Sequence, residues 1–283
     1  MFYSVTDVTL RELPAWDGPL AILFEGGEGS STRPSLHLQA ARGGYLRLVG
    51  GEDVLLWGRV DREWYDVELV RGAVPKILPP LRADDEHDRD GWTRRFAALL
   101  LAAEVTPLAR GRTAMLSRSD ARLGSLDALR AQVDLEWDIG SAATVLLRPL
   151  SAPDDGRVHM YRKLVRRDAL PPVVTWWCKG LFAYVVLDGH DRLQAALLEG
   201  KQPPLLVLED LVKLPATEID QRKAQTLRDA ELVDAMPWVS GRANAMNLML
   251  RSAWDPRNEW RRATPGFPLD QELWEREVRG TKL

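Results

Sequence analysis

A short polar run between two apolar segments holds the side chains of this chain that are best suited to chemistry. The run is Asp188-Gly189-His190-Asp191-Arg192, with two carboxylates, an imidazole and a guanidinium within five residues. An arginine presents a forked set of donors that matches a phosphate, and histidine titrates near neutral pH. Carboxylates supply the oxygen ligands that Mg²⁺ prefers. The run is therefore a candidate for binding a phosphate group, with or without a metal ion.

The segments on either side of this run are predicted to hold it in a defined geometry. Residues 184–187 are β-branched, aromatic or aliphatic, as in a strand, whereas residues 193–198 carry apolar and small side chains at helical spacing. A strand, tight turn and helix in this order aim the unpaired N–H groups of the helix's first turn at one place, which suits a phosphate. Alternatively, Asp188 only caps the helix and Arg192 pairs with a carboxylate elsewhere, in a fold that binds no small molecule.

The motif and its flanks resemble the ParB/sulfiredoxin superfamily, and within it the branch with an Asp-Gly-His-x-Arg turn. That branch includes free-serine kinases and many ParB-like nuclease domains. The resemblance covers residues 143–212 and includes a Pro-initiated strand at 171–174, a hairpin turn at Lys179-Gly180, and a helix stop at Gly200 before a further strand. It implies a small mixed-sheet domain that binds the phosphates of ATP or CTP together with Mg²⁺.

The resemblance also implies a role for each residue of the motif. Backbone amides from Gly189 onward, together with His190, Asp191 and Arg192, would hold the phosphates, and Asp188 and Asp191 would bind Mg²⁺. Asp188 and His190 would be the catalytic residues, with His190 as a phosphate donor or a general acid and base. The reaction would then be Mg²⁺-dependent phosphoryl transfer or nucleotide hydrolysis, in which positioning and charge neutralisation do most of the catalysis.

The densest basic segment of the chain precedes the Pro-initiated strand of this unit. Residues 157–167 hold Arg157, Arg162, Lys163, Arg166 and Arg167 and no acidic residue. Helical spacing would place Arg162 and Arg166 on one side, where we expect them to contact the nucleotide phosphates. The alternative interpretation is a solvated helix face.

Departures from the family pattern narrow the choice of activity. Sulfiredoxins carry a catalytic cysteine immediately before the motif histidine, and this chain has Gly189 there, which disfavours sulfinic-acid reduction. The single cysteine, Cys178, is expected to be a small buried hydrophobe. No helix-turn-helix pattern follows Val212, which disfavours a chromosome-partition role.

Composition excludes several classes of protein. The chain has 283 residues, of which 45% are hydrophobic and 28% charged, enough for a sizeable core and roughly two domains. With a net charge of −3 the chain lacks the overall positive charge that would attract nucleic acid, so the nuclease interpretation is disfavoured. One cysteine excludes an intrachain disulfide, and neither a signal-peptide pattern nor a run of about 20 apolar residues is found. We expect a cytoplasmic protein.

The pattern of apolar runs and breaks predicts an α+β fold. Residues 1–75 read as a β-rich antiparallel meander, and residues 76–140 as a helical connector with helices at 92–105 and 125–133. Residues 141–212 form the ParB/sulfiredoxin-like domain. Residues 213–283 form a helical C-terminal extension that packs back on that domain, with Asp270 as the cap of the last helix. The glycine-rich residues 25–32 and the acidic residues 84–90 are interpreted as a hairpin loop and a solvated run.

A different class of function stays open beside nucleotide binding. The chain could be a protein-binding module, such as a toxin-neutralising partner, that uses the old nucleotide fold as a scaffold. Its interface would be the N-terminal region or the tail with Trp238, Trp254, Trp260 and Trp274. Anchoring of a helical cap is the more ordinary role for those tryptophans.

Overall fold

The fold is α+β, and the structure, a computed structural model, describes most of the chain. The residues described are 8–13, 20–26, 33–61, 66–72, 77–79, 81, 88–126, 129, 134–136, 143–235, 242–253, 259–263 and 266–280. Within these ranges no helix combines the length and the apolar character needed to span a membrane. Most of the acidic run and most of the glycine-rich loop lie outside the described residues.

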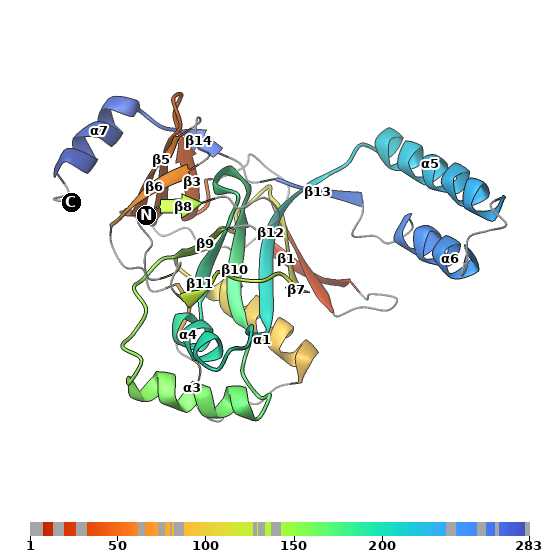
Figure 1. Cartoon of the computed structure of the whole chain (residues 1–283). Coiled ribbons are helices and arrows are strands. Elements are labelled where there is room, and N and C mark those ends of the chain that lie inside the picture. The colour runs from red at the N-terminus through yellow and green to blue at the C-terminus, as the bar shows by residue number, and fades with distance from the viewer. Residues whose placement is uncertain are drawn as a thin grey trace.

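A large mixed sheet, here sheet A, forms the centre of the molecule (Figure 1). Its order is β1-β2-β7-β12-β10-β11-β9, and β13 pairs with the far end of β12. The bounds are β1 Val8–Leu13, β2 Ala21–Gly26, β7 Thr113–Ser119, β9 Ala143–Leu146, β10 Val173–Cys178, β11 Ala183–Asp188, β12 Leu205–Lys213 and β13 Trp260–Arg262. The pair β10 and β12 and the pair β9 and β11 are parallel, and the other pairs are antiparallel.

A second sheet, sheet B, contains the predicted N-terminal meander. Its order is β14-β3-β4-β5-β6-β8, and only the β14–β3 pair is parallel. The bounds are β3 Leu36–Ala40, β4 Tyr45–Gly50, β5 Asp53–Asp61, β6 Asp66–Arg71, β8 Asp134–Glu136 and β14 Gly266–Pro268. The meander prediction is confirmed for β3 to β6, whereas the β1–β2 hairpin belongs to sheet A.

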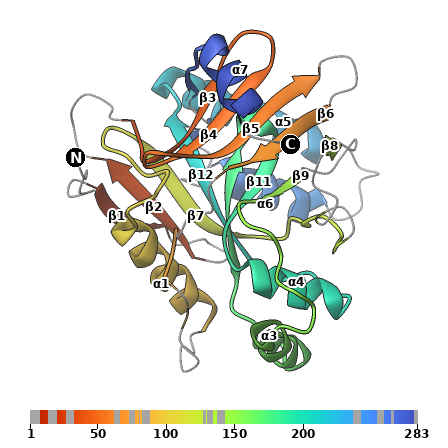
Figure 2. The ribbon, with the colours of Figure 1, turned by 90° about the vertical axis from the view of Figure 1, so that its left-hand side faces the viewer.

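Helices cover sheet A and extend from it. Their bounds are α1 Arg89–Ala102, α3 Gly156–Arg166, α4 His190–Leu198, α5 Ala216–Asp234, α6 Arg242–Ala253 and α7 Gln271–Gly280, with a 3₁₀ turn, η1, at Lys179–Leu181. In both views α3 lies on the outer side of α4 (Figure 2). The predicted helix at 125–133 is described only at Leu126 and Leu129, which are helical.

Alternation along the central strands divides the core between the two faces of sheet A. On β10, Val174 and Trp176 belong to a cluster that also contains residues of sheet B and of α1. Val173 and Trp177 point to the opposite face, where Leu193 of α4 joins their cluster. A strand buried on both faces is expected where other layers cover each side of a sheet. Sheet A therefore fixes α4, and with it the turn that precedes α4.

Two segments that were predicted to be helical also contain strands. Residues 76–140 are not a purely helical connector, because β7 lies in the middle of sheet A, between β2 and β12. The C-terminal extension is not purely helical either, because β13 and β14 pair with β12 and β3. Its last helix packs on sheet B, where Trp274 donates to the carbonyl of Leu46, and not on the motif-bearing unit. The predicted cap is confirmed, since Asp270 accepts from Glu272 N–H at 2.9 Å.

Candidate functional site

The β11–α4 turn has the predicted strand, turn and helix. β11 ends at Asp188, Gly189 adopts φ +93°, and α4 begins at His190. No side chain among the described residues caps the first turn of α4. A left-handed conformation costs little only for glycine, and it lets the chain reverse directly into the helix. The uncapped first turn leaves N–H donors and the positive end of the helix dipole at one spot.

The Arg192 side chain folds back over this turn. Its Nη2 donates to the carboxylate of Asp188, and its Cζ lies 5.4 Å from the centroid of the Phe96 ring on α1. Arg192 is only 2% exposed, and its Nη1 has no hydrogen-bond partner among the described residues. A buried guanidinium with an unsatisfied donor is costly, and an anion would relieve that cost.

Asp191, the next residue to Arg192 in the helix, is paired with several donors. Ser151 donates to it at 2.7 Å, Arg148 Nη2 lies 3.2 Å away and Arg157 Nε lies 3.8 Å away. Burial raises the pKa of the Asp191 carboxyl, but the Ser151 hydrogen bond and the Arg148 charge outweigh it and leave the pKa below its usual value. Asp191 is therefore ionised at neutral pH and organises the cations around it.

His190 is a structural residue in this arrangement. It is 3% exposed, and its Nε2 lies 3.4 Å from the backbone N–H of Arg148, for which it is the acceptor. Burial first, and then the charge of Arg148, lower the pKa of His190 to about 3. A buried imidazole with this pKa stays neutral at pH 7, which disfavours His190 as a general acid, and its catalytic role stays a prediction.

Two partly exposed arginines are the accessible cations of the turn. Arg148, Arg157 and Arg192 face three carboxylates, those of Asp155, Asp188 and Asp191. The Arg148 and Arg157 side chains are 32% and 62% exposed, whereas those of Asp191 and Arg192 are almost fully buried. An anion would therefore approach from the side of Arg148 and Arg157.

The phenol of Tyr161, on α3, lies close enough to the turn for the charges of the turn to act on it. Burial raises its pKa, and the charges of Arg192, Asp188, Asp191 and Arg157 also act on it. At neutral pH the hydroxyl is protonated and can donate a hydrogen bond. Tyr161 therefore adds a neutral donor to the cations that surround the turn.

The structure does not bring Arg162 and Arg166 to the turn. Both bind Glu199 at the opposite end of α4, with Nε to carboxylate distances of 2.6 and 2.8 Å. The hydrogen bond from Arg166, followed by that from Arg162, lowers the pKa of Glu199 to about 2. Their prediction as phosphate contacts is corrected, because these arginines join α3 to α4.

The residues that the sequence reasoning missed are Arg148 and Ser151. β9 runs parallel to β11 with Leu146 opposite Val186, so Arg148, two residues farther on, is level with Asp188. The carboxyl ends of neighbouring parallel strands meet at one edge of a sheet, where ligands commonly bind. Polar residues directly after the predicted strand at 143–147 were the available signal.

The carboxylates do not form a ready magnesium site. Asp188 is bound by Arg192, whereas Asp191 is bound by Ser151 and Arg148. In the described ranges, no three His, Cys, Asp or Glu side chains come together as a metal would require. The set does not fit an ion held by protein ligands alone, so no step is assigned to one. The buried Cys178, with its pKa raised by burial to about 12, is the inert hydrophobe that was predicted.

Comparison with protein-family models gives no match, and neither a curated protein nor a solved structure matches the chain. Function is therefore inferred from the geometry of the β11–α4 turn and from the resemblance in its motif.

Proposed function

We propose that the protein binds the phosphate groups of a nucleotide, ATP or CTP, at the β11–α4 turn. The observation that carries the proposal is the buried Arg192 guanidinium, whose Nη1 has no partner among the described residues and which lies over the uncapped start of α4. Helix N-termini and guanidinium groups both recur in proteins as binding elements for phosphate. The resemblance to the Asp-Gly-His-x-Arg branch supports a nucleotide as the source of the phosphate.

Arg148 and Arg157 would guide the phosphates to Arg192. Both are partly exposed, both approach Asp191, and neither is committed to a carboxylate at the far end of α4. Tyr161 would contribute a hydroxyl donor beside them. Because His190 is neutral and buried, the proposal is nucleotide binding by a switch or carrier, and hydrolysis or phosphoryl transfer would need a base outside this turn. Magnesium would then arrive with the nucleotide phosphates.

The test is calorimetric titration of ATP, CTP, GTP and inorganic triphosphate, with and without Mg²⁺. We expect one nucleotide to bind, and Arg148→Ala and Arg157→Ala each to raise its Kd by about tenfold, which is the loss of one charge-assisted hydrogen bond. Arg162→Ala is the matched control, because Arg162 lies on the same helix as Arg157 but binds Glu199. Absence of binding by all four ligands, or equal losses in the control, would reject the proposal.

A second candidate function, a protein-binding module, has its own observation. α5 and α6 pack on each other as a hairpin that stands apart from the two sheets (Figure 1). Leu227 and Leu232 on α5 are 45% and 59% exposed, which is unusual for large apolar side chains. A toxin-neutralising protein could use such an arm to bind its target. The paired variant Leu227→Glu/Leu232→Glu would abolish capture of that target and leave nucleotide titrations unchanged.

Tryptophans of the C-terminal region act as anchors where the structure describes them. Trp274 stacks edge-on against Tyr45 and donates to Leu46, and Trp260 receives the Lys213 ammonium over its ring. Trp238 and Trp254 lie outside the described residues. These contacts support the anchoring interpretation for Trp274 and Trp260, so the apolar residues of α5 are the better candidate for an interface.

A further inference from the structure

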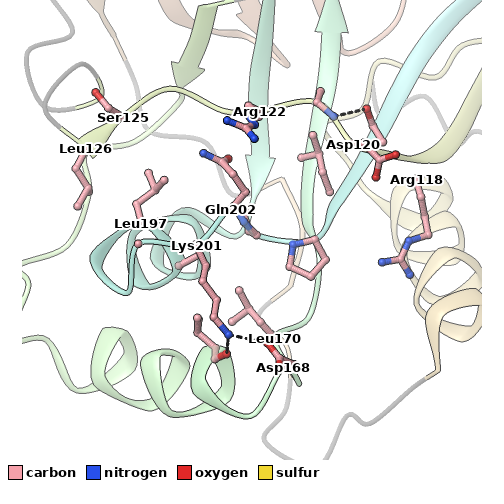
Figure 3. Close-up of a pocket in the computed structure, with 18 residues that line it drawn as sticks. Arg118, Asp120, Arg122, Ser125, Leu126, Asp168, Leu170, Leu197, Lys201 and Gln202 are labelled. Atoms are coloured by element: carbon pink, nitrogen blue, oxygen red, sulfur yellow. Dashed lines mark hydrogen bonds and ion pairs between the residues drawn. The ribbon is translucent and has the colours of Figure 1, made fainter.

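A cavity of about 900 Å³ lies at the end of α4 that is opposite to the motif (Figure 3). Its walls come from the end of β7 and the loop after it, from the C-terminal part of α4, and from the Pro203-Pro204 segment that leads into β12. Cavities of 300–1,000 Å³ are the usual size of small-molecule sites. The nine-residue helix α4 is roughly 12 Å long, so this cavity is separate from the β11–α4 turn.

Two cations that line this cavity have no partner among the described residues. Arg118 is the second-last residue of β7 and Arg122 lies on the loop that follows, and the structure gives neither guanidinium a hydrogen bond or an ion pair with another described residue (Figure 3). Lys201, which also lines the cavity, is by contrast held by Asp168 at 2.7 Å and by the carbonyl of Val165 at 3.3 Å. Arg118 and Arg122 are therefore the groups available to a ligand.

The environment of Arg118 favours an incoming anion. The side chain is half-buried, and burial first, followed by the like charge of Arg89, lowers the pKa of its guanidinium. The charges of Asp90 and Asp120 raise this pKa, although neither carboxylate forms an ion pair with Arg118. A guanidinium remains charged at any physiological pH, so this unpaired cation is destabilised where it stands. An anion bound beside it would remove that destabilisation.

The rest of the cavity combines polar and apolar side chains. Its apolar side chains are those of Val165 on α3, Leu170 in the segment after α3, Leu197 on α4, the helical Leu126, and the two prolines. Gln202 does not compete for a ligand, since its amide is bound to Leu123 N–H and C=O. Leu126 and Leu197 are only partly buried, so a ligand that contacted only the arginines would leave them in contact with water. A good fit requires an anionic group on an apolar body.

We propose that this cavity binds a small organic acid, in which a carboxylate or a phosphate ester contacts Arg118 and Arg122 and an apolar group covers Leu170 and Leu197. The guanidinium fork accepts both kinds of anion in a bidentate manner. The site is independent of the proposed nucleotide site, because it uses other residues at the other end of α4.

Calorimetric titration with four probes tests the proposal on the full chain. The probes are 1-naphthoate, 1-naphthyl phosphate, the neutral 1-naphthol and inorganic phosphate. We expect at least one of the two naphthyl anions to bind. 1-Naphthol and inorganic phosphate should bind at least about tenfold more weakly, because 1-naphthol lacks the anionic group and inorganic phosphate lacks the apolar body. The stronger of the two anions identifies the carboxylate or the phosphate ester as the natural group.

Variants then locate the site. Arg118→Ala/Arg122→Ala should raise the Kd of the better probe by at least about tenfold. Arg42→Ala removes an exposed arginine on the β3–β4 turn of sheet B and should leave it unchanged. Arg148→Ala should also leave it unchanged, which separates this site from the nucleotide site. Failure of both naphthyl anions to bind, 1-naphthol binding as tightly as they do, or an unchanged Kd in the double variant would each overturn the proposal.

Discussion

The guanidinium of Arg192 lies against Gly189, so closely that a Cβ at position 189 would stand 2.8 Å from both Nε and Nη2. Gly189 also has φ +93°, a conformation that other residues adopt only with strain. Glycine is thus required twice, once for the turn and once for the approach of the arginine. The contact links the backbone of the turn directly to the group that we propose binds phosphate.

This contact predicts the cost of adding a methyl group. Gly189→Ala should destabilise the fold by more than the ~1–2 kcal/mol of left-handed strain, because the alanine also displaces Arg192. Gly200→Ala is the matched control, since Gly200 has φ +68° and a Cβ added there would have nothing within 4 Å. Urea unfolding measures both. Equal losses of stability in the two variants would contradict a tight contact between Gly189 and Arg192.

Asp188 has two possible roles that one substitution separates. If its carboxylate mainly holds Arg192, Asp188→Asn frees the guanidinium and removes a negative charge beside the anion site. Triphosphate should then bind roughly tenfold more tightly in the absence of Mg²⁺, since a charge about 4 Å away near a surface acts with at least 1.4 kcal/mol. Weaker binding, seen only with Mg²⁺ present, would instead support the metal-ligand role implied by the family resemblance.

The local structure of the candidate site could be predicted, whereas its full composition could not. The order of strand, glycine turn and helix is encoded within residues 183–198, because turn and helix signals are local. Arg148 and Ser151 reach Asp191 only through the pairing of β9 with β11. Likewise, the burial of His190 depends on packing around α4 and is not visible in its neighbours along the chain.

The difference between local signals and tertiary packing also explains why β7 was not predicted from the sequence. β7 reads as Thr-Ala-Met-Leu-Ser-Arg-Ser, with Ala114, Met115 and Leu116 as a continuous apolar group. Ala114 and Leu116 join one core cluster and Met115 another, because the strand is covered on both faces. Such a strand shows no alternation of polar and apolar residues, so a short segment of this kind cannot be assigned from periodicity.

Two buried histidines predict how stability depends on pH. The folded-state pKa of His190 is about 3 and that of His37 is about 4, against an ordinary value of 6.5. Below pH 6.5 the unfolded chain takes up protons that the folded chain does not. The contribution of each histidine to the free energy of unfolding is therefore complete above pH 6.5 and is lost as the pH falls toward 3.

Urea midpoints across this window measure the effect. His190→Gln keeps an acceptor for the Arg148 N–H and cannot titrate, so the loss of stability between pH 6.5 and 4 should be smaller than in the wild type. His159→Gln, at an exposed position of α3, should follow the wild-type curve. A His190→Gln curve as steep as the wild type would show that the imidazole takes up a proton in the folded state.

Glu277 predicts how the last helix is held on sheet B. Its carboxylate accepts from Arg47 Nη1 at 2.5 Å and from Trp57 Nε1 at 2.8 Å, while Arg47 also donates to Gln39. Glu277→Ala leaves two half-buried donors short of a partner, so we expect a loss of about 1–3 kcal/mol and faster amide exchange along α7. Glu275→Ala is the control on the same helix, because the contacts of Glu275 with described residues, Gln271 and Arg279, are exposed ones on the helix surface. This variant should cost no more than about 1 kcal/mol. If the two variants lose equal stability, or if exchange in α7 does not change, the Glu277 contacts do not hold the helix, and Trp274 must do so through Tyr45 and Leu46.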